Sequence, residues 1–144
     1  YEIPKDDNIG KVIITKESGK NLYKYVLTAS DWKLYNARYD NIGYAYFKDT
    51  INILGFTCKK AILNINNGKQ QITAYYTESI KSFPKSIEPM FAGLPGLVLR
   101  YELKTKNGSI RYTANKISFE QLDNAIFTEP VKGFMLKQYK PHAR

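Results

Sequence analysis

The stretch that decides the fold is Glu88-Pro89-Met90-Phe91-Ala92-Gly93-Leu94-Pro95-Gly96-Leu97-Val98-Leu99, in which a proline-broken segment leads into an apolar strand. Proline presets its own φ and glycine tolerates a positive φ, so Pro95-Gly96 predicts a type II turn from Leu94 to Leu97. We expect a strand to begin at Leu97. We also expect Gly96 to shape this turn rather than to touch a ligand.

Alternating hydrophobicity predicts hairpins on both sides of this stretch. After it, residues 97–104 alternate, Lys106-Asn107-Gly108-Ser109 is a turn, and a return strand follows. Before it, Cys58–Ile65 and Gln70–Thr77 flank a turn at residues 66–69. The inner face of the later hairpin is predicted to carry Leu97, Leu99, Tyr101, Leu103, Ile110, Tyr112 and Ala114. In the earlier hairpin, Ala61, Leu63 and Ile65 share one face of the first strand, and Ile72, Ala74 and Tyr76 share one face of the second.

A long connection joins the two hairpins, from Glu78 to Gly96. Its three prolines, Pro84, Pro89 and Pro95, interrupt any long helix and donate no ladder bonds. Connections beyond about 12–15 residues are usually functional or disordered. Because this one is rich in apolar residues, we expect an ordered flap packed on the sheet, with Ile80, Phe83, Ile87, Met90, Phe91 and Leu94 as its apolar side chains.

The two ends of the chain are less regular. Residues 1–10 have a loop composition, a first strand opens at Val12, and Ser18-Gly19-Lys20-Asn21 predicts a turn into a strand over 22–28. Ser30 or Asp31 is a candidate helix cap, and residues 32–39 are open between helix and extended structure. Later predictions are a strand at 44–47, a helical turn at 119–125 capped by Ser118, a brief strand at 126–127, an edge strand at 133–139 and a frayed end at 141–144.

Composition is typical of a globular domain. At 144 residues, 43% hydrophobic and 24% charged, the chain is long enough for a single domain over residues 1–144. The 22 Lys and Arg exceed the 13 Asp and Glu by nine, which favours acidic partners such as anionic lipid, acidic glycan, nucleic acid or protein. Most basic residues are spread out, and a tail with Lys132, Lys137, Lys140 and Arg144 is either an electrostatic foot or a solubilising end.

No catalytic, metal or cofactor pattern stands out, so we expect a protein that is not an enzyme and needs no cofactor. Cys58, the single cysteine, has no histidine beside it in sequence and is expected to pack as a small apolar residue. His142, the single histidine, lies in the tail. No run approaches the ~18 apolar residues of a membrane-spanning helix.

Three blocks of the chain resemble the GLPGLI family of exported Bacteroidetes proteins, which is named for its own motif. Residues 53–61 (ILGFTCKKA) resemble its IxGYxCxKA block, residues 74–80 (AYYTESI) its AWYTxxI block, and residues 91–99 (FAGLPGLVL) its FxGLPGLIL signature. Departures include Leu54, where the family usually has Gly, and Tyr75, where Trp is common. The resemblance covers Asp49 to Ser118, and its structural motif residues here are Gly55, Cys58, Gly93, Pro95 and Gly96.

The resemblance implies export to the cell envelope, as a periplasmic, outer-membrane-associated or surface protein, and it implies no established reaction. The chain begins without methionine, as a processed or trimmed protein does, and any export signal lies outside it. The family's strand pattern is similar to the curved half-barrel of outer-membrane lipoprotein carriers. With the hairpins, it predicts a mainly β fold, or α+β with little helix, built on a curved antiparallel sheet under a proline-rich flap.

Three functions follow as hypotheses. The first is a binding module in which the flap and a tyrosine-rich sheet hold an apolar or glycan ligand or an extended peptide, contacted by Tyr75, Tyr76, Phe83, Met90, Phe91 and Leu94. The second is an interaction subunit of an outer-membrane assembly, with exposed aromatics and a basic surface facing an acidic partner. The third is a nucleic-acid binder, which the expected export disfavours.

Overall fold

A computed structural model describes residues 10–82, 87–130 and 132–140 of the chain. Most of the predicted N-terminal loop and all of the predicted frayed end lie outside these ranges. The chain divides into two compact units, one formed by residues 38–119 and the other by residues 1–37 with 120–144. The expectation of a single domain stays a prediction, and each unit is described below by itself.

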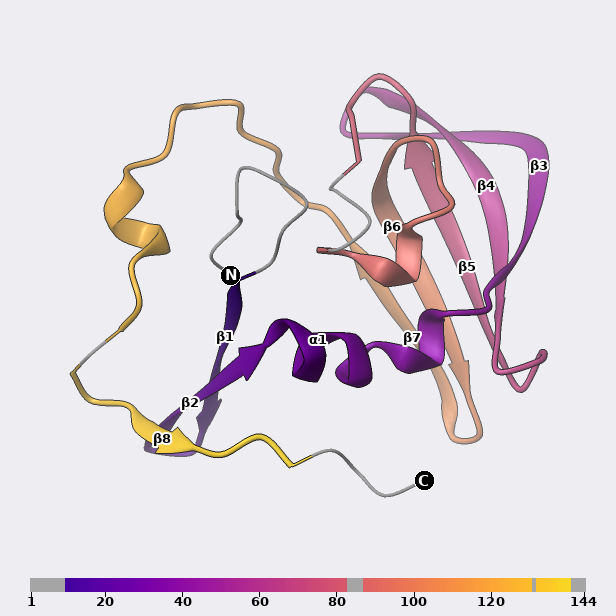
Figure 1. Ribbon diagram of the computed structural model, residues 1–144. Helices are drawn as coiled ribbons and strands as arrows, with labels where there is room; N and C mark the ends of the chain where they lie inside the picture. Colours follow the sequence, from indigo (N-terminus) through magenta and orange to yellow (C-terminus); the bar gives the residue numbers. More distant parts are fainter. Residues whose placement is uncertain (1–9, 83–86, 131, 141–144) are drawn as a thin grey trace. The chain divides into compact units, whose positions relative to one another are not determined.

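The larger unit is a five-stranded antiparallel sheet in which neighbours in sequence are neighbours in the sheet (Figure 1). The mainly β fold built from hairpins is thereby confirmed. In Figure 1 the sheet is a curved layer that does not close into a barrel. Its strands are β3 (Gly43–Ile53), β4 (Phe56–Ile65), β5 (Gln70–Thr77), β6 (Leu97–Thr105) and β7 (Gly108–Thr113).

The β4–β5 hairpin forms as the alternation predicts. Asn66, Asn67 and Gly68 all have positive φ (53°, 55° and 83°), a conformation that Asn and Gly tolerate best. The inner-face residues of both strands are fully or almost fully buried. With the flap they form the main core, which comprises Ala61, Leu63, Ile65, Ile72, Ala74, Tyr76, Phe91 and Leu94.

The predicted inner face of β6 is wrong in its first half. Tyr75 pairs with Arg100, but Tyr76 pairs with Val98, so Leu99 is an extra residue in the ladder. Such a β-bulge moves the preceding side chains to the other face. Val98 therefore packs on the main core together with Tyr101 and Leu103, whereas Leu97 and Leu99 join a second cluster with Ile53 and Cys58.

The smaller unit is a three-stranded sheet with one helix. Strands β1 (Lys11–Ser18) and β2 (Asn21–Thr28) form the predicted hairpin, and β8 (Met135–Lys137) lies parallel to β2, within the predicted edge strand. Helix α1 (Ala29–Tyr35) follows β2 directly. Val12, Leu27 and Trp32 are buried together in this unit.

The N-cap of helix α1 is Thr28, which precedes both predicted caps in the sequence. The structure has neither Ser30 nor Asp31 as the cap, since Thr28 accepts a hydrogen bond from the Asp31 amide, and the Asp31 carboxylate accepts one from the Thr28 amide. This reciprocal pair is a capping box, which uses the third helical residue to complete the cap. The rest of the ambiguous segment contains a single 3-10 turn, η1 (Ala37–Tyr39).

The predictions for residues 119–127 are wrong. Instead of a helical turn capped by Ser118 and then a strand, the chain forms a 3-10 turn, η3 (Asn124–Phe127), after Asp123. The Asp123 carboxylate accepts a hydrogen bond from the Ala125 amide at 2.9 Å. A short acidic side chain can accept a hydrogen bond from the amide two residues later. The turn therefore begins after Asp123 and not after Ser118.

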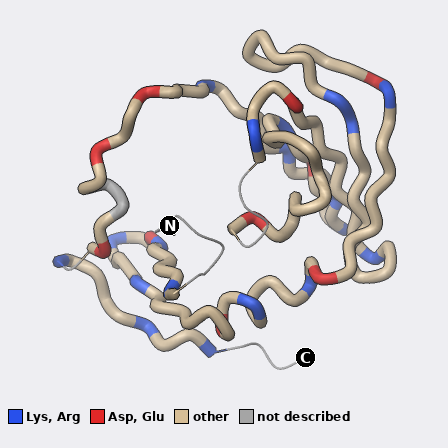
Figure 2. Tube along the Cα trace, turned by 45° about the horizontal axis from the view of Figure 1, so that its top comes forward, with Lys and Arg blue, Asp and Glu red and all other residues tan. Residues whose placement is uncertain are grey.

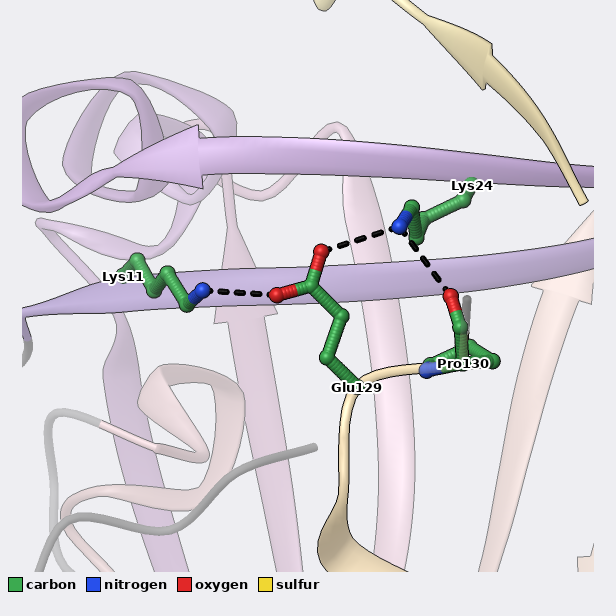
Figure 3. Close-up of polar contacts among 4 residues, drawn as sticks. All are labelled: Lys11, Lys24, Glu129 and Pro130. Atoms are coloured by element: carbon green, nitrogen blue, oxygen red, sulfur yellow. Dashed lines mark hydrogen bonds and ion pairs between the residues drawn. The ribbon is translucent and has the colours of Figure 1, made fainter. Parts of the chain in front are cut away.

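Glu129 fastens the segment after η3 to the β1–β2 hairpin (Figure 3). Its two carboxylate oxygens accept hydrogen bonds from Lys11 Nζ at 2.7 Å and Lys24 Nζ at 2.9 Å. Lys24 also donates to the Pro130 carbonyl at 3.0 Å. The hydrogen bonds from Lys11 and Lys24 lower the pKa of Glu129 to about 2.

Replacing this carboxylate should destabilise the smaller unit in a pH-dependent way. A folded-state pKa below the ordinary value means that the ionised group stabilises the fold at neutral pH, and that this contribution is lost as the pH falls toward 2. Glu129→Gln should therefore lower the melting temperature at pH 7, with Glu17→Gln on β1 as a control of equal charge change. A difference from wild type that persists undiminished at pH 2 would contradict this assignment.

Candidate functional site

Two tyrosines of β3 hold the flap against the larger sheet. The Tyr44 hydroxyl donates to the Met90 carbonyl at 3.3 Å and accepts from the Gly93 amide at 3.0 Å. The Tyr46 hydroxyl donates to the Gly93 carbonyl at 2.6 Å. The two rings stack with centroids 6.2 Å apart, and burial raises the pKa of Tyr44, which keeps its hydroxyl protonated. Both backbone groups of Gly93 are therefore bonded to β3.

The glycines of the signature are needed because the flap approaches the sheet so closely. A Cβ on Gly93 would lie within 3.0 Å of three ring atoms of Tyr44. A Cβ on Gly96 would overlap the backbone carbonyl group of Thr77, which is fully buried. Any side chain at either position must therefore push the flap away or displace its neighbour.

The predicted type II turn at Leu94–Leu97 is wrong. Gly96 does not adopt a positive φ, which that turn requires at its third position. The Leu97 amide donates to the Ile80 carbonyl at 3.1 Å, so it pairs with the beginning of the flap instead of closing a turn on Leu94. The predicted strand start at Leu97 is confirmed. Gly96 is required here by close approach, and its conformational freedom is not used.

The six side chains predicted to contact a ligand lie in different environments. Tyr76, Phe91 and Leu94 are 3–4% exposed and belong to the main core, and half-buried Met90 packs against them. Tyr75 lies on the opposite face, in the second cluster. Phe83 lies outside the described residues. At the described positions, the protein's own side chains occupy the space between flap and sheet.

The other two motif residues, Gly55 and Cys58, lie in the β3–β4 hairpin. Leu54 and Gly55 form its turn with φ of 52° and 84°, a pairing of positive values that favours glycine at both positions. Cys58 is fully buried, and its Sγ donates to the Phe56 carbonyl at 3.5 Å. Burial raises the pKa of the Cys58 thiol, so it stays protonated and is a poor nucleophile.

Cations and aromatic rings alternate across the sheet face opposite the flap. Strand pairing sets Lys60 beside Tyr75 and Tyr75 beside Arg100. Lys60 Nζ lies 5.2 Å from the ring centroid of Phe47, and the Arg100 guanidinium carbon lies 5.9 Å from that of Tyr75. Lys60, Tyr75 and Arg100 are half-buried. We call Phe47, Lys60, Tyr75 and Arg100 the cation–aromatic row.

The cations of this row differ from their neighbours in lacking carboxylate partners. Lys59 pairs with Glu78 at 3.1 Å and Arg111 with Glu102 at 2.8 Å. In the part of the chain that the structure describes, no ion pair involves Lys60 or Arg100. Sequence reasoning missed this row, although Lys60 and Arg100 were visible as polar residues of alternating strands. Their alignment depends on the register of β4 with β5 and of β5 with β6.

The positive charge is concentrated in the larger unit. Its 12 Lys and Arg against 5 Asp and Glu leave a formal charge of +7, whereas the smaller unit has 10 against 8, or +2. Figure 2 shows the basic residues scattered along the trace, as the sequence predicts, and not gathered into one run. The larger unit therefore carries most of the net positive charge.

Other chemistry is sparse among the described residues. They contain no cluster of three or more His, Cys, Asp or Glu that could hold a metal ion, and no helix long and apolar enough to cross a membrane. Glu88 precedes η2 (Pro89–Phe91), a 3-10 turn in the flap; it is half-buried, and burial raises the pKa of its carboxyl. Among the described residues, no ion pair involves this carboxyl.

Comparisons with known proteins add little. No family model and no curated protein matches the chain. Among solved structures, PNGF-II in a C2 crystal form is 19% identical over 85% of this chain, with a TM-score of 0.45, and a P21 form is 17% identical with a TM-score of 0.43. The chain spans 19–20% of the length of PNGF-II. The resemblance to the GLPGLI family stays a prediction.

Substitution of Gly96 tests the close approach of the flap. Gly96→Ala should lower the free energy of unfolding by about 1–3 kcal/mol, because the added methyl meets a buried backbone carbonyl that cannot rotate away. Pro95→Ala should have a smaller effect, since it mainly frees the unfolded chain. Urea unfolding of both variants measures the difference, and an unchanged stability in Gly96→Ala would refute the close approach.

Proposed function

We propose that this chain is a non-enzymatic interaction protein whose larger unit binds an acidic protein partner through the cation–aromatic row. The observation that carries the proposal is the pair of half-buried cations, Lys60 and Arg100, that lie against rings and not against carboxylates. The charge of +7 on the larger unit supports the same choice of partner.

A cation held on an aromatic ring keeps its charge. The ring contributes only about 0.5–1 kcal/mol at exposed sites, and it supplies no negative charge. The rings also restrict the two side chains, which lowers the entropy lost when a partner's carboxylate binds. Carboxylates can form charge-assisted hydrogen bonds with both Lys and Arg, and Arg can bind them through two parallel N–H groups. The row is therefore suited to acidic side chains.

The other hypotheses have weaker support. Phe91 and Leu94 fill the described space beneath the flap, which leaves an apolar ligand there without support. Base stacking needs an open ring face, whereas Arg100 lies over the half-buried ring of Tyr75. The family resemblance implies export, so the proposed partner belongs to the cell envelope, as a component of an outer-membrane assembly.

Removing the two cations should weaken this binding without unfolding the protein. The variant K60Q/R100Q should bind polyglutamate about tenfold more weakly than wild type, which corresponds to roughly 1.4 kcal/mol. The control K69Q/K106Q removes the same charge from two exposed positions at hairpin ends of the same unit, and it should bind nearly as wild type does. Titrations at low and high salt measure both, since binding should weaken with salt.

Crosslinking in native membranes extends this test to the cellular partner. The same crosslinked neighbour should be recovered with wild type and the control and lost with K60Q/R100Q. Equal polyglutamate affinity for both double variants would contradict the proposal. So would recovery of wild type only as a free monomer at low salt.

A further inference from the structure

The two edges of the larger sheet are not equivalent. The pairing of β3 with β4 is interrupted between Tyr46 and Thr50, and the interruption contains the charged residues Lys48 and Asp49. Irregular pairing and charged side chains are the usual protection of an edge strand against further pairing. In addition, the Tyr44 and Tyr46 hydroxyls of this strand are already bonded to the flap. The β3 edge is therefore protected.

The β7 edge lacks the irregular pairing, and its one charged side chain, Arg111, is already paired with Glu102. It pairs with β6 in unbroken register from Thr105 with Gly108 to Arg100 with Thr113. All six of its residues are exposed. In the described part of the chain, β7 has a strand neighbour only on its β6 side. An edge strand of this kind presents backbone amides and carbonyls that can pair with another extended chain.

The side chains of β7 differ between its two faces. Ile110 and Tyr112 lie on the flap side of the sheet and are 47% and 49% exposed. Tyr112 stacks on Tyr101 with centroids 4.8 Å apart, and Tyr101 in turn meets Phe91 at 5.3 Å. The exposed ring is therefore held in place by the core, which makes it a ready apolar contact for an added strand.

The other face at this edge is basic. Arg100, Lys104 and Arg111 alternate there with the single carboxylate of Glu102, which pairs with Arg111. The formal charge of these four residues is positive. An added strand would thus meet apolar groups on one face and net positive charge on the other.

We infer that β7 is a docking edge for an extended acidic segment of the partner, in which acidic and apolar side chains alternate. The segment adds a sixth strand, its apolar side chains lie beside Ile110 and Tyr112, and its carboxylates lie beside Arg111, the cation of β7. This inference rests on the proposed function for the choice of an acidic partner. A second copy of this chain fits less well, because pairing β7 with itself brings like charges together across the new strand pair.

Designed peptides test the inference with a defined probe. A capped nine-residue peptide of alternating glutamate and valine should bind the full chain and slow amide hydrogen exchange across residues 108–113. The same peptide, N-methylated at two consecutive central residues, lacks one amide on each of its edges and should bind on the order of tenfold more weakly. A lysine and valine peptide should not bind. Tyr112→Ser should weaken binding, whereas Leu122→Ser, at an exposed position of the smaller unit, should not.

The outcomes separate this inference from the proposed function. Equal binding of the methylated peptide would overturn the docking edge and leave the cation–aromatic row intact. Failure of the glutamate–valine peptide, while polyglutamate still binds through Lys60 and Arg100, would also overturn the edge alone. Loss of polyglutamate binding would instead remove the proposed function. Protection of residues 108–113 in a concentration-dependent dimer without peptide would overturn the inference in favour of a second copy.

Discussion

The larger unit depends on the close approach of the flap backbone to the sheet. Gly93 lies against the ring of Tyr44, and Gly96 lies against the carbonyl of Thr77. With these two contacts in place, Phe91 and Leu94 reach the main core and the Leu97 amide meets the Ile80 carbonyl. The two contacts involve different parts of the sheet, a side chain of β3 and the backbone at the end of β5. The flap is therefore fixed at both sides of Leu94.

Because of these contacts, the flap is part of the core of the larger unit. The surfaces that remain for binding a partner are the opposite face and the β7 edge. The buried flap residues replace water on one face, in the same way as a helix packed on a sheet does. The opposite face keeps half-buried cations on aromatic rings, and the β7 edge remains exposed. A sheet that is already packed against its flap suits the proposed recognition of a partner by face and edge, because less has to be ordered when the partner binds.

Local patterns in the sequence predict much of the fold, since turn residues and alternation depend on neighbours in the chain. The turn at residues 66–69 and the common face of Ile72 and Ala74 follow from such patterns. The bulge at Leu99 does not, because it is defined by a register between β5 and β6 that alternation in one strand cannot specify. The sequence likewise could not show why residue 96 is a glycine. A Pro-Gly pair favours a turn locally, but here a carbonyl 19 residues earlier in the chain, at Thr77, excludes any side chain.

The same limit applies to the candidate site. Apolar flap residues predicted to contact a ligand are the ones that a packed core uses first, as Phe91 and Leu94 show. The cation–aromatic row needs four strands in register before its members meet, so composition alone predicted only an acidic partner and not the surface proposed to bind it.

A double-mutant cycle between Gly93 and Tyr44 tests the central claim most directly. Urea unfolding of Gly93→Ala, Tyr44→Ala and the double variant gives the coupling between the two sites. If the ring of Tyr44 is what excludes a side chain at residue 93, Gly93→Ala should lower the free energy of unfolding by about 1–3 kcal/mol in the wild-type background and by much less once the ring is removed. Equal effects of Gly93→Ala in both backgrounds would contradict the account.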